Sequence, residues 1–133
     1  MAGDDRYRAF AEWRLTTHRK GKGRSVRFFR LTRDHTVIWS TVMRGHYAGA
    51  PPTIRECIAE VRCSKETARR IILLAQARGY FQIRSDQGDA RKRLVTPSRQ
   101  CVAEYEAMVD GYLRLPEILG VRRSRSRAGR PKN

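Results

Sequence analysis

Residues 63–80 read CSKETARRIILLAQARGY, and they join a short polar opening to a long apolar run. Ser64 suits the N-cap of a helix and Gly79 suits its end, so the spacing predicts a helix over residues 64–78. One face of this helix is apolar and is expected to pack inward: Ala68, Ile71, Ile72 and Ala75. The polar opening and the basic residues next to it are not needed for this packing, so we expect them to have another role.

A second, shorter helix is predicted just before this one. Thr53 and Glu56 have the spacing of a capping box, which predicts a helix over residues 54–61. Arg62 and Cys63 form a tight turn between the two helices. A short helix, a turn and a capped second helix make a helix-turn-helix, in which the second helix can lie in the DNA major groove. The opening of helix 64–78 would then meet the base edges.

A β-hairpin is predicted directly after the helix-turn-helix. The β-favouring runs YFQIRS and RKRLVT flank the turn-forming segment DQGDA, which places the hairpin at residues 80–96. Further helices are predicted over residues 4–18, from a cap at Thr32 or Asp34 to an end made by Gly45 and then AGAPP (48–52), and after Pro97. The expected fold is therefore mainly α with a small β-hairpin wing (α+β), a winged helix-turn-helix with additional N- and C-terminal helices.

Charge indicates the partner. The chain has 133 residues, a formal net charge of +16 and a pI near 11.1, which points to a polyanion, most simply nucleic acid. Residues 97–120 are the exception, with two basic and four acidic groups. This acidic segment is expected to face away from nucleic acid. It carries an apolar stripe that predicts dimerisation: Val102, Tyr105, Met108, Val109 and Tyr112.

The stretches IAEVRCSKETARRIILLAQARGYFQIRS and GDARKRLVTPS resemble the winged helix-turn-helix regulators of bacterial type, particularly MarR-like transcriptional regulators. The similarity covers roughly residues 32–115. Its most specific parts are Ser64 and Thr67 at the start of the recognition helix, and Asp89 and Arg91 in the wing. The resemblance implies a homodimer held by N- and C-terminal helices, and a wing arginine, here Arg91, that reaches into the minor groove.

Ten residues are the candidate DNA-binding positions. They lie on the recognition helix and on the wing: Ser64, Lys65, Glu66, Thr67, Arg69, Arg70, Arg84, Arg91, Lys92 and Arg93. Glu66 either accepts a hydrogen bond from cytosine or, as we prefer, stabilises the helix N-terminus. Thr67 is expected to pack or to contact phosphate. The arginines and lysines have the alternative of simply forming a solvated surface.

The residue pattern favours no chemistry other than binding. Neither a paired nucleophile and base nor a phosphate-binding glycine loop is visible, so we expect no enzyme, no cofactor and no metal site. Cys57 is expected in the core, and a redox role for Cys57 or Cys63 is the weaker interpretation. Scattered, unpaired cysteines favour a reducing cytoplasm, with the protein associated with the nucleoid. No apolar run predicts a membrane span, and nothing in the sequence supports a small-molecule effector.

We therefore expect a basic N-terminal helical segment and loop (1–31), a DNA-binding domain (32–96), a dimerisation helix (97–119) and a disordered basic tail (120–133). The preferred function is a sequence-specific regulator that binds double-stranded DNA. The alternatives are a replication, partition or nucleoid-type protein with the same winged helix, or an RNA-binding module. In the tail, Gly129-Arg130-Pro131 resembles part of an AT-hook, but a nonspecific basic arm is favoured.

Overall fold

The computed structural model describes residues 3–20 and 23–120. The elements in these residues are α1 (Gly3–Lys20), α2 (Arg24–Phe29), α3 (Arg33–Ala48), α4 (Ile54–Ala59), α5 (Lys65–Ala77), β1 (Phe81–Ser85), β2 (Arg93–Pro97), α6 (Arg99–Leu113) and α7 (Leu115–Ile118). The predicted fold class, mainly helical with one antiparallel hairpin, is confirmed. The tail after residue 120, with its AT-hook-like segment, lies outside the described residues.

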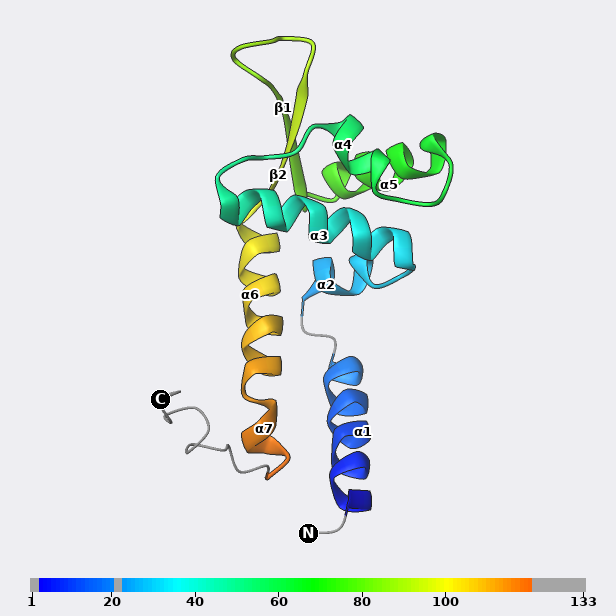
Figure 1. Cartoon of the computed structure of the whole chain (residues 1–133), viewed down its shortest axis with the longest axis vertical. Helices are drawn as coiled ribbons and strands as arrows, with labels where there is room; N and C mark the ends of the chain where they lie inside the picture. Colours follow the sequence, from blue (N-terminus) through cyan, green and yellow to red (C-terminus); the bar gives the residue numbers. More distant parts are fainter. Residues whose placement is uncertain (1–2, 21–22, 121–133) are drawn as a thin grey trace, which may run out of the picture. The chain divides into compact units, whose positions relative to one another are not determined.

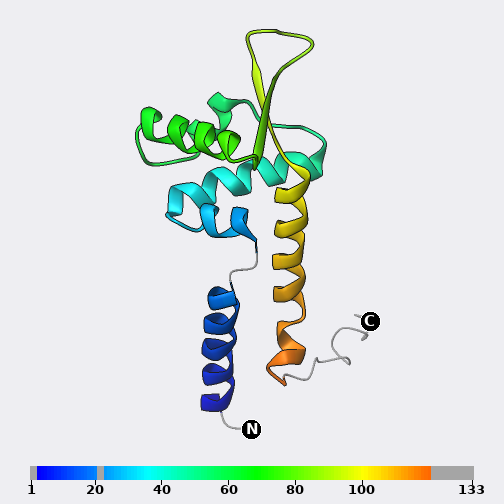
Figure 2. The same cartoon turned by 180° about the vertical axis from the view of Figure 1, so that it is seen from behind.

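The chain divides into two compact units, which are described separately. The central unit runs from Lys22 to Glu106, and the terminal unit combines Met1–Gly21 with Ala107–Asn133. Within the central unit, α4 and α5 lie on the same side of α3, and the hairpin projects beyond these helices (Figures 1 and 2). This arrangement is that of a helix-turn-helix followed by a wing.

Helix α3 begins at one of the two predicted caps and ends in the predicted AGAPP segment. The Thr32 side chain accepts the N–H of His35, and Gly49 closes the helix in the left-handed conformation at φ 71°. The AGAPP segment (48–52) ends the helix as predicted, whereas the part in this termination assigned to Gly45 is wrong. Gly45 lies inside α3, where the chain after the helix packs against it. A Cβ at Gly45 would come within 2.6 Å of Pro52 Cδ, so this contact requires a glycine. The glycine therefore permits close packing and does not stop the helix.

Helix α2 was not predicted, because the end of the N-terminal segment 1–31 was expected to be a loop. A residue of a distant helix provides the hydrogen-bond acceptor for the N-terminus of α2. The Glu104 carboxylate of α6 accepts the Ser25 N–H at 2.9 Å and also accepts a hydrogen bond from the Ser25 hydroxyl. Gly23, at φ 93°, leads the chain into α2 against this carboxylate. The side chains of Val26, Phe28 and Phe29 are buried.

The core of the central unit is aromatic at its centre. Phe29 stacks on Trp39 and on Phe81, with ring centroids 5.4 and 4.9 Å apart. The four predicted inward positions of α5 are all buried: Ala68, Ile71, Ile72 and Ala75. Cys57 is fully buried as predicted, and it is the buried residue of the short helix α4. The apolar half of residues 63–80 therefore attaches α5 to the rest of the unit.

In the terminal unit, α1 contacts the C-terminal part of the chain through aromatic residues. The Trp13 and Tyr112 rings meet edge to face with centroids 5.2 Å apart, and Arg14 donates to the Tyr112 hydroxyl at 3.3 Å. The single C-terminal helix that was predicted is divided at Arg114 into α6 and α7, and Pro116 lies in the first turn of α7. Several large apolar side chains of this unit remain exposed: Tyr7, Phe10, Leu15, Leu113 and Ile118.

Candidate nucleic-acid interface

The N-terminus of α5 is built as the sequence predicts. The Ser64 hydroxyl accepts the Thr67 N–H at 3.1 Å and lies 3.0 Å from the Thr67 hydroxyl. Both side chains are exposed, so the cap stands at the protein surface. Helix N-termini with free N–H groups suit phosphate. The Ser64 hydroxyl donates to the Thr67 hydroxyl, which leaves the Thr67 O–H as the donor for a ligand.

The outer face of α5 carries charged side chains that form no ion pairs within the described residues. Lys65, Glu66, Arg69 and Arg70 are all exposed. Within the described residues, none of these four side chains has a hydrogen-bond or ion-pair partner. Their charges are therefore available to a ligand, and the two faces of α5 are separated as the helical wheel predicts.

The turn that joins α4 to α5 is held by a residue of α3. One carboxylate oxygen of Asp34 accepts the Arg62 N–H at 3.2 Å. Burial first, and then a hydrogen bond to Asp34, raise the pKa of the Cys63 thiol. Asp34 of α3 therefore holds the turn in place, and the position of this turn helps to set the direction of the N-terminus of α5.

The wing is a short antiparallel ladder with a long tip. Ile83 pairs with Val95, and Arg84 pairs with Leu94. In the tip, the Asp89 side chain accepts the Arg91 N–H at 3.0 Å, and the Lys92 N–H donates to the Asp89 carbonyl at 2.9 Å. The four predicted wing cations are all exposed: Arg84, Arg91, Lys92 and Arg93. Asp89 thus gives the backbone before the cations a defined turn.

The wing and α5 belong to the same compact unit. The Tyr80 N–H donates to the Ala75 carbonyl at 2.8 Å where α5 ends, and the Ser98 N–H donates to Tyr80 at 2.9 Å. The Val95 N–H donates to the Pro52 carbonyl at 2.9 Å. The predicted recognition helix and the predicted wing are therefore connected within the central unit.

Two exposed arginines near this surface were not among the predicted positions. Arg62 lies in the turn before Ser64, and Arg55 lies in the first turn of α4. A basic residue two positions before a helix N-cap was the available signal for Arg62. For Arg55, no sequence signal distinguished it from other surface arginines.

The cysteines and acidic groups offer no second chemistry in the described part of the chain. Burial raises the pKa of the Cys57 thiol to about 12 and that of Cys101 to about 11, so both stay protonated at neutral pH and are poor nucleophiles. No group of three or more His, Cys, Asp or Glu in residues 3–20 and 23–120 is placed to hold a metal ion. No helix among these residues is long and apolar enough to cross a membrane.

Neither the protein-family models nor the curated proteins match this chain. Solved structures do. The chain is similar to the transcriptional regulator Tm0710 from Thermotoga maritima, with TM-score 0.58, 17% identity and coverage of 92% of this chain and 84% of that one. A mutant of MepR from S. aureus gives TM-score 0.58, 11% identity and coverage of 89% and 86%.

A putative MarR-like transcription regulator from Bacillus cereus is also similar, with TM-score 0.50, 12% identity and coverage of 95% of this chain and 90% of that one. Sequence identity at this level establishes the fold. The chain therefore has the MarR-like winged-helix fold, which confirms the resemblance seen in residues 32–115.

Proposed function

We propose that this chain is a sequence-specific transcription regulator that binds double-stranded DNA. In this proposal α5 lies in the major groove with its N-terminal side chains at the base edges, and the wing lies at the minor groove. The observation that carries the proposal is the two-faced α5: its inner face is buried, while Lys65, Arg69 and Arg70 are exposed and unpaired.

Duplex DNA fits the surface better than single-stranded RNA does. Recognition of single strands uses exposed aromatic rings on which bases stack. In the central unit Phe28, Phe29, Trp39, Tyr80 and Phe81 are all buried in the core. Tyr47 is exposed, but its hydroxyl donates to the Glu106 carboxylate of α6 at 2.6 Å. The similar regulators of known structure support a binding protein over an enzyme. A cytoplasmic, nucleoid-associated location remains part of the proposal.

The ten predicted positions are proposed to divide their tasks. Ser64 and Thr67 contact phosphate at the helix N-terminus, Lys65, Arg69 and Arg70 face the groove, and Glu66 stabilises the N-terminus of α5. The four wing cations follow the neighbouring backbone and minor groove, with Arg91 inserted into the groove. Arg62 joins the phosphate contacts.

A homodimer is the proposed binding form. The terminal unit exposes several large apolar side chains, among them Tyr7 at 72% and Leu113 at 70% exposure. So many exposed apolar residues in a small unit are typical of an interaction surface. Pairing two copies through this unit would cover them. A two-fold dimer would place two recognition helices about 34 Å apart, one turn of DNA.

Selection of bound sequences from random duplex DNA tests the proposal. A regulator should enrich one short two-fold-symmetric sequence and bind it roughly 10³-fold or more tightly than random duplex at the same salt concentration. A replication, partition or nucleoid-type protein should bind with similar affinity but enrich no sequence, which would replace the proposal with that alternative. Tighter binding to single-stranded RNA than to any duplex would favour the RNA-binding module.

A further inference from the structure

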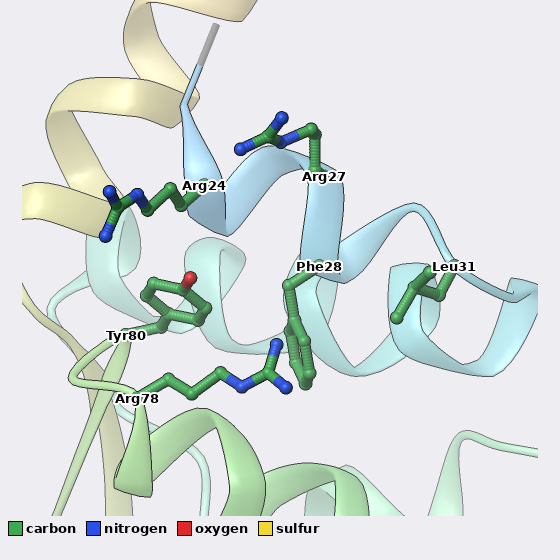
Figure 3. A pocket seen from close by; sticks show the side chains of 6 residues that line it. All are labelled: Arg24, Arg27, Phe28, Leu31, Arg78 and Tyr80. Carbon is green, nitrogen blue, oxygen red and sulfur yellow. The ribbon is translucent and has the colours of Figure 1, made fainter. Parts of the chain in front are cut away.

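A small cavity lies between α2 and the C-terminal end of α5, inside the central unit (Figure 3). Its volume is about 280 Å³, and it is lined by Arg24, Arg27, Phe28, Leu31, Arg78 and Tyr80. Three of these six residues are arginines. They come from two elements far apart in the sequence, and α5 meets the cavity only at its end.

The lining of the cavity carries three positive charges and no acidic residue. Arg24, Arg27 and Arg78 are exposed, and within the described residues none of the three forms an ion pair. The acidic residue at this end of α2 is Glu104, and its carboxylate is already bound by Ser25 and by Gln100. Three like charges around one cavity repel one another, and a bound anion would remove that repulsion.

The floor of the cavity is formed by two buried aromatic rings. Phe28 and Tyr80 are only 3% and 6% exposed. The Arg78 guanidinium lies 5.4 Å from the centre of the Phe28 ring, a cation–π contact that orients it. Figure 3 shows the Tyr80 hydroxyl directed toward α2 and the Arg78 side chain running below Tyr80, with its guanidinium beside the Phe28 ring. The cavity thus combines one oriented arginine with two exposed arginines of α2.

We propose that this cavity binds the phosphate group of a small phosphorylated ligand. Guanidinium groups bind oxyanions through pairs of parallel N–H donors. A tetrahedral phosphate presents several oxygen edges to three arginines, whereas a planar carboxylate presents one. The volume is at the low end of ligand pockets, which fits a phosphate or a mononucleotide and not a larger molecule.

A phosphate of duplex DNA is the less favoured occupant. The cavity lies at the C-terminal end of α5, and the proposed DNA-reading end begins at Ser64. The thirteen residues of α5 span about 20 Å between these ends. A straight duplex lying against the N-terminus of α5 and the wing would not have to reach α2.

Titration of the full chain, followed through the side-chain Nε–H signals of its arginines by NMR, tests the proposal. The probes are adenosine 5′-monophosphate, inorganic phosphate, adenosine and benzoate. The monophosphate should give saturable shifts in Arg24, Arg27 and Arg78. Arg27→Ala and Arg78→Ala should each weaken binding about tenfold, the effect of one charge-assisted contact. Arg55→Ala, which removes an exposed arginine elsewhere in the central unit, should change it less than twofold.

Binding of inorganic phosphate alone would support the proposal and show that the anion suffices, and tighter binding of the monophosphate would show that the cavity also accepts the base. Adenosine or benzoate binding as tightly as the monophosphate would overturn it. Chemical-shift changes spread equally over all arginines would also overturn the proposal. An equal loss of affinity in Arg55→Ala would do the same. If a random duplex displaced the monophosphate and moved the same three signals, the cavity would be a DNA contact and the proposal wrong. Arg78→Lys, which keeps the charge and loses the paired donors, should bind more weakly than wild type if Arg78→Ala fails to fold.

Discussion

The carboxylate of Asp34 accepts the backbone N–H of Arg62 at 3.2 Å, so α3 holds the turn that precedes the recognition helix. The two residues are far apart in the sequence, and the contact joins the helix-turn-helix to the helix on which it rests. Asp34 is half-buried and lies in the first turn of α3. A side chain that contacts no ligand thereby sets the direction of α5.

Asp34→Ala should therefore loosen the turn. The loss of one hydrogen bond to a charged, partly exposed acceptor is expected to lower the free energy of unfolding by about 1 kcal/mol. Urea denaturation measures this loss. Asp34→Asn keeps an oxygen acceptor and should recover at least half of the stability. Equal losses in both variants would mean that the charge of Asp34, and not the bond to Arg62, matters.

The Glu104 carboxylate has a similar role for α2. Burial acts to raise its pKa, but hydrogen bonds from the Ser25 and Gln100 side chains and from the Ser25 and Arg24 backbone more than offset this, so the pKa lies below its ordinary value of 4.5. A lowered pKa in the folded state means that the ionised group stabilises the fold above pH 4.5 and that this contribution is lost as the pH falls through the folded-state pKa.

Glu104→Gln should consequently be less stable than the wild type at pH 7, by about 1 kcal/mol, the order expected for a charge-assisted hydrogen bond. The difference between the two proteins isolates Glu104, because all other groups are common to both. It should shrink as the pH falls below 4.5. Thermal unfolding at a series of pH values measures it, and a difference that is unchanged at the acid end would show that shape and not charge is responsible.

Local signals in the sequence were enough for the helix-turn-helix and the wing. Ser64, Thr53 and Thr32 were recognised as caps because an N-cap contacts residues only two or three positions away. Helix α2 was missed because its N-terminus depends on Glu104, 79 residues away. The role of Gly45 was misread because Pro52, whose approach requires a glycine, returns only after the helix ends. Both features depend on contacts between segments distant in the sequence, which a local residue pattern does not predict.

The exposed residues of the terminal unit lead to a prediction about assembly. Leu113 is 70% exposed, so Leu113→Glu should leave the fold of a single copy intact. If this surface joins two copies, a buried charge there should weaken the dimer about 10- to 100-fold, since burying a leucine is worth about 1.5–3 kcal/mol. Sedimentation velocity at micromolar concentration measures the effect. Leu31→Glu, at a leucine that is 64% exposed in the central unit, is the matched control. A wild-type protein that sediments as a monomer would exclude the dimer.

Arg69 is the residue of α5 that we expect to read a base. It is exposed and unpaired one turn inside the helix, where a guanidinium can pair with guanine O6 and N7. Arg69→Ala should cost about 1–3 kcal/mol on the selected site, relax the preference at one base pair in each half-site, and cost much less on random DNA. Fluorescence anisotropy on both duplexes measures this, with Arg99→Ala as a control for the loss of one positive charge. Equal losses on both duplexes would make Arg69 a phosphate contact only.

Arg91 in the wing should respond to groove shape and not to base identity. Its N–H is held by the Asp89 side chain at 3.0 Å, so the backbone that carries the guanidinium is fixed while the side chain is exposed. A·T-rich DNA has a narrow minor groove with a more negative potential, which favours an inserted arginine. Arg91→Ala should therefore weaken binding to a site with A·T-rich flanks by about 1.5–3 kcal/mol, the range for a hydrogen bond to a charged group, and should weaken binding less when the flanks are G·C-rich. Asp89→Ala keeps the arginine but releases its backbone, so its effect should have the same direction and be smaller. Competition binding with the two flank sequences around one central site measures both variants. An equal loss on both flanks would place Arg91 on phosphate, and the wing would then add affinity without selecting a sequence.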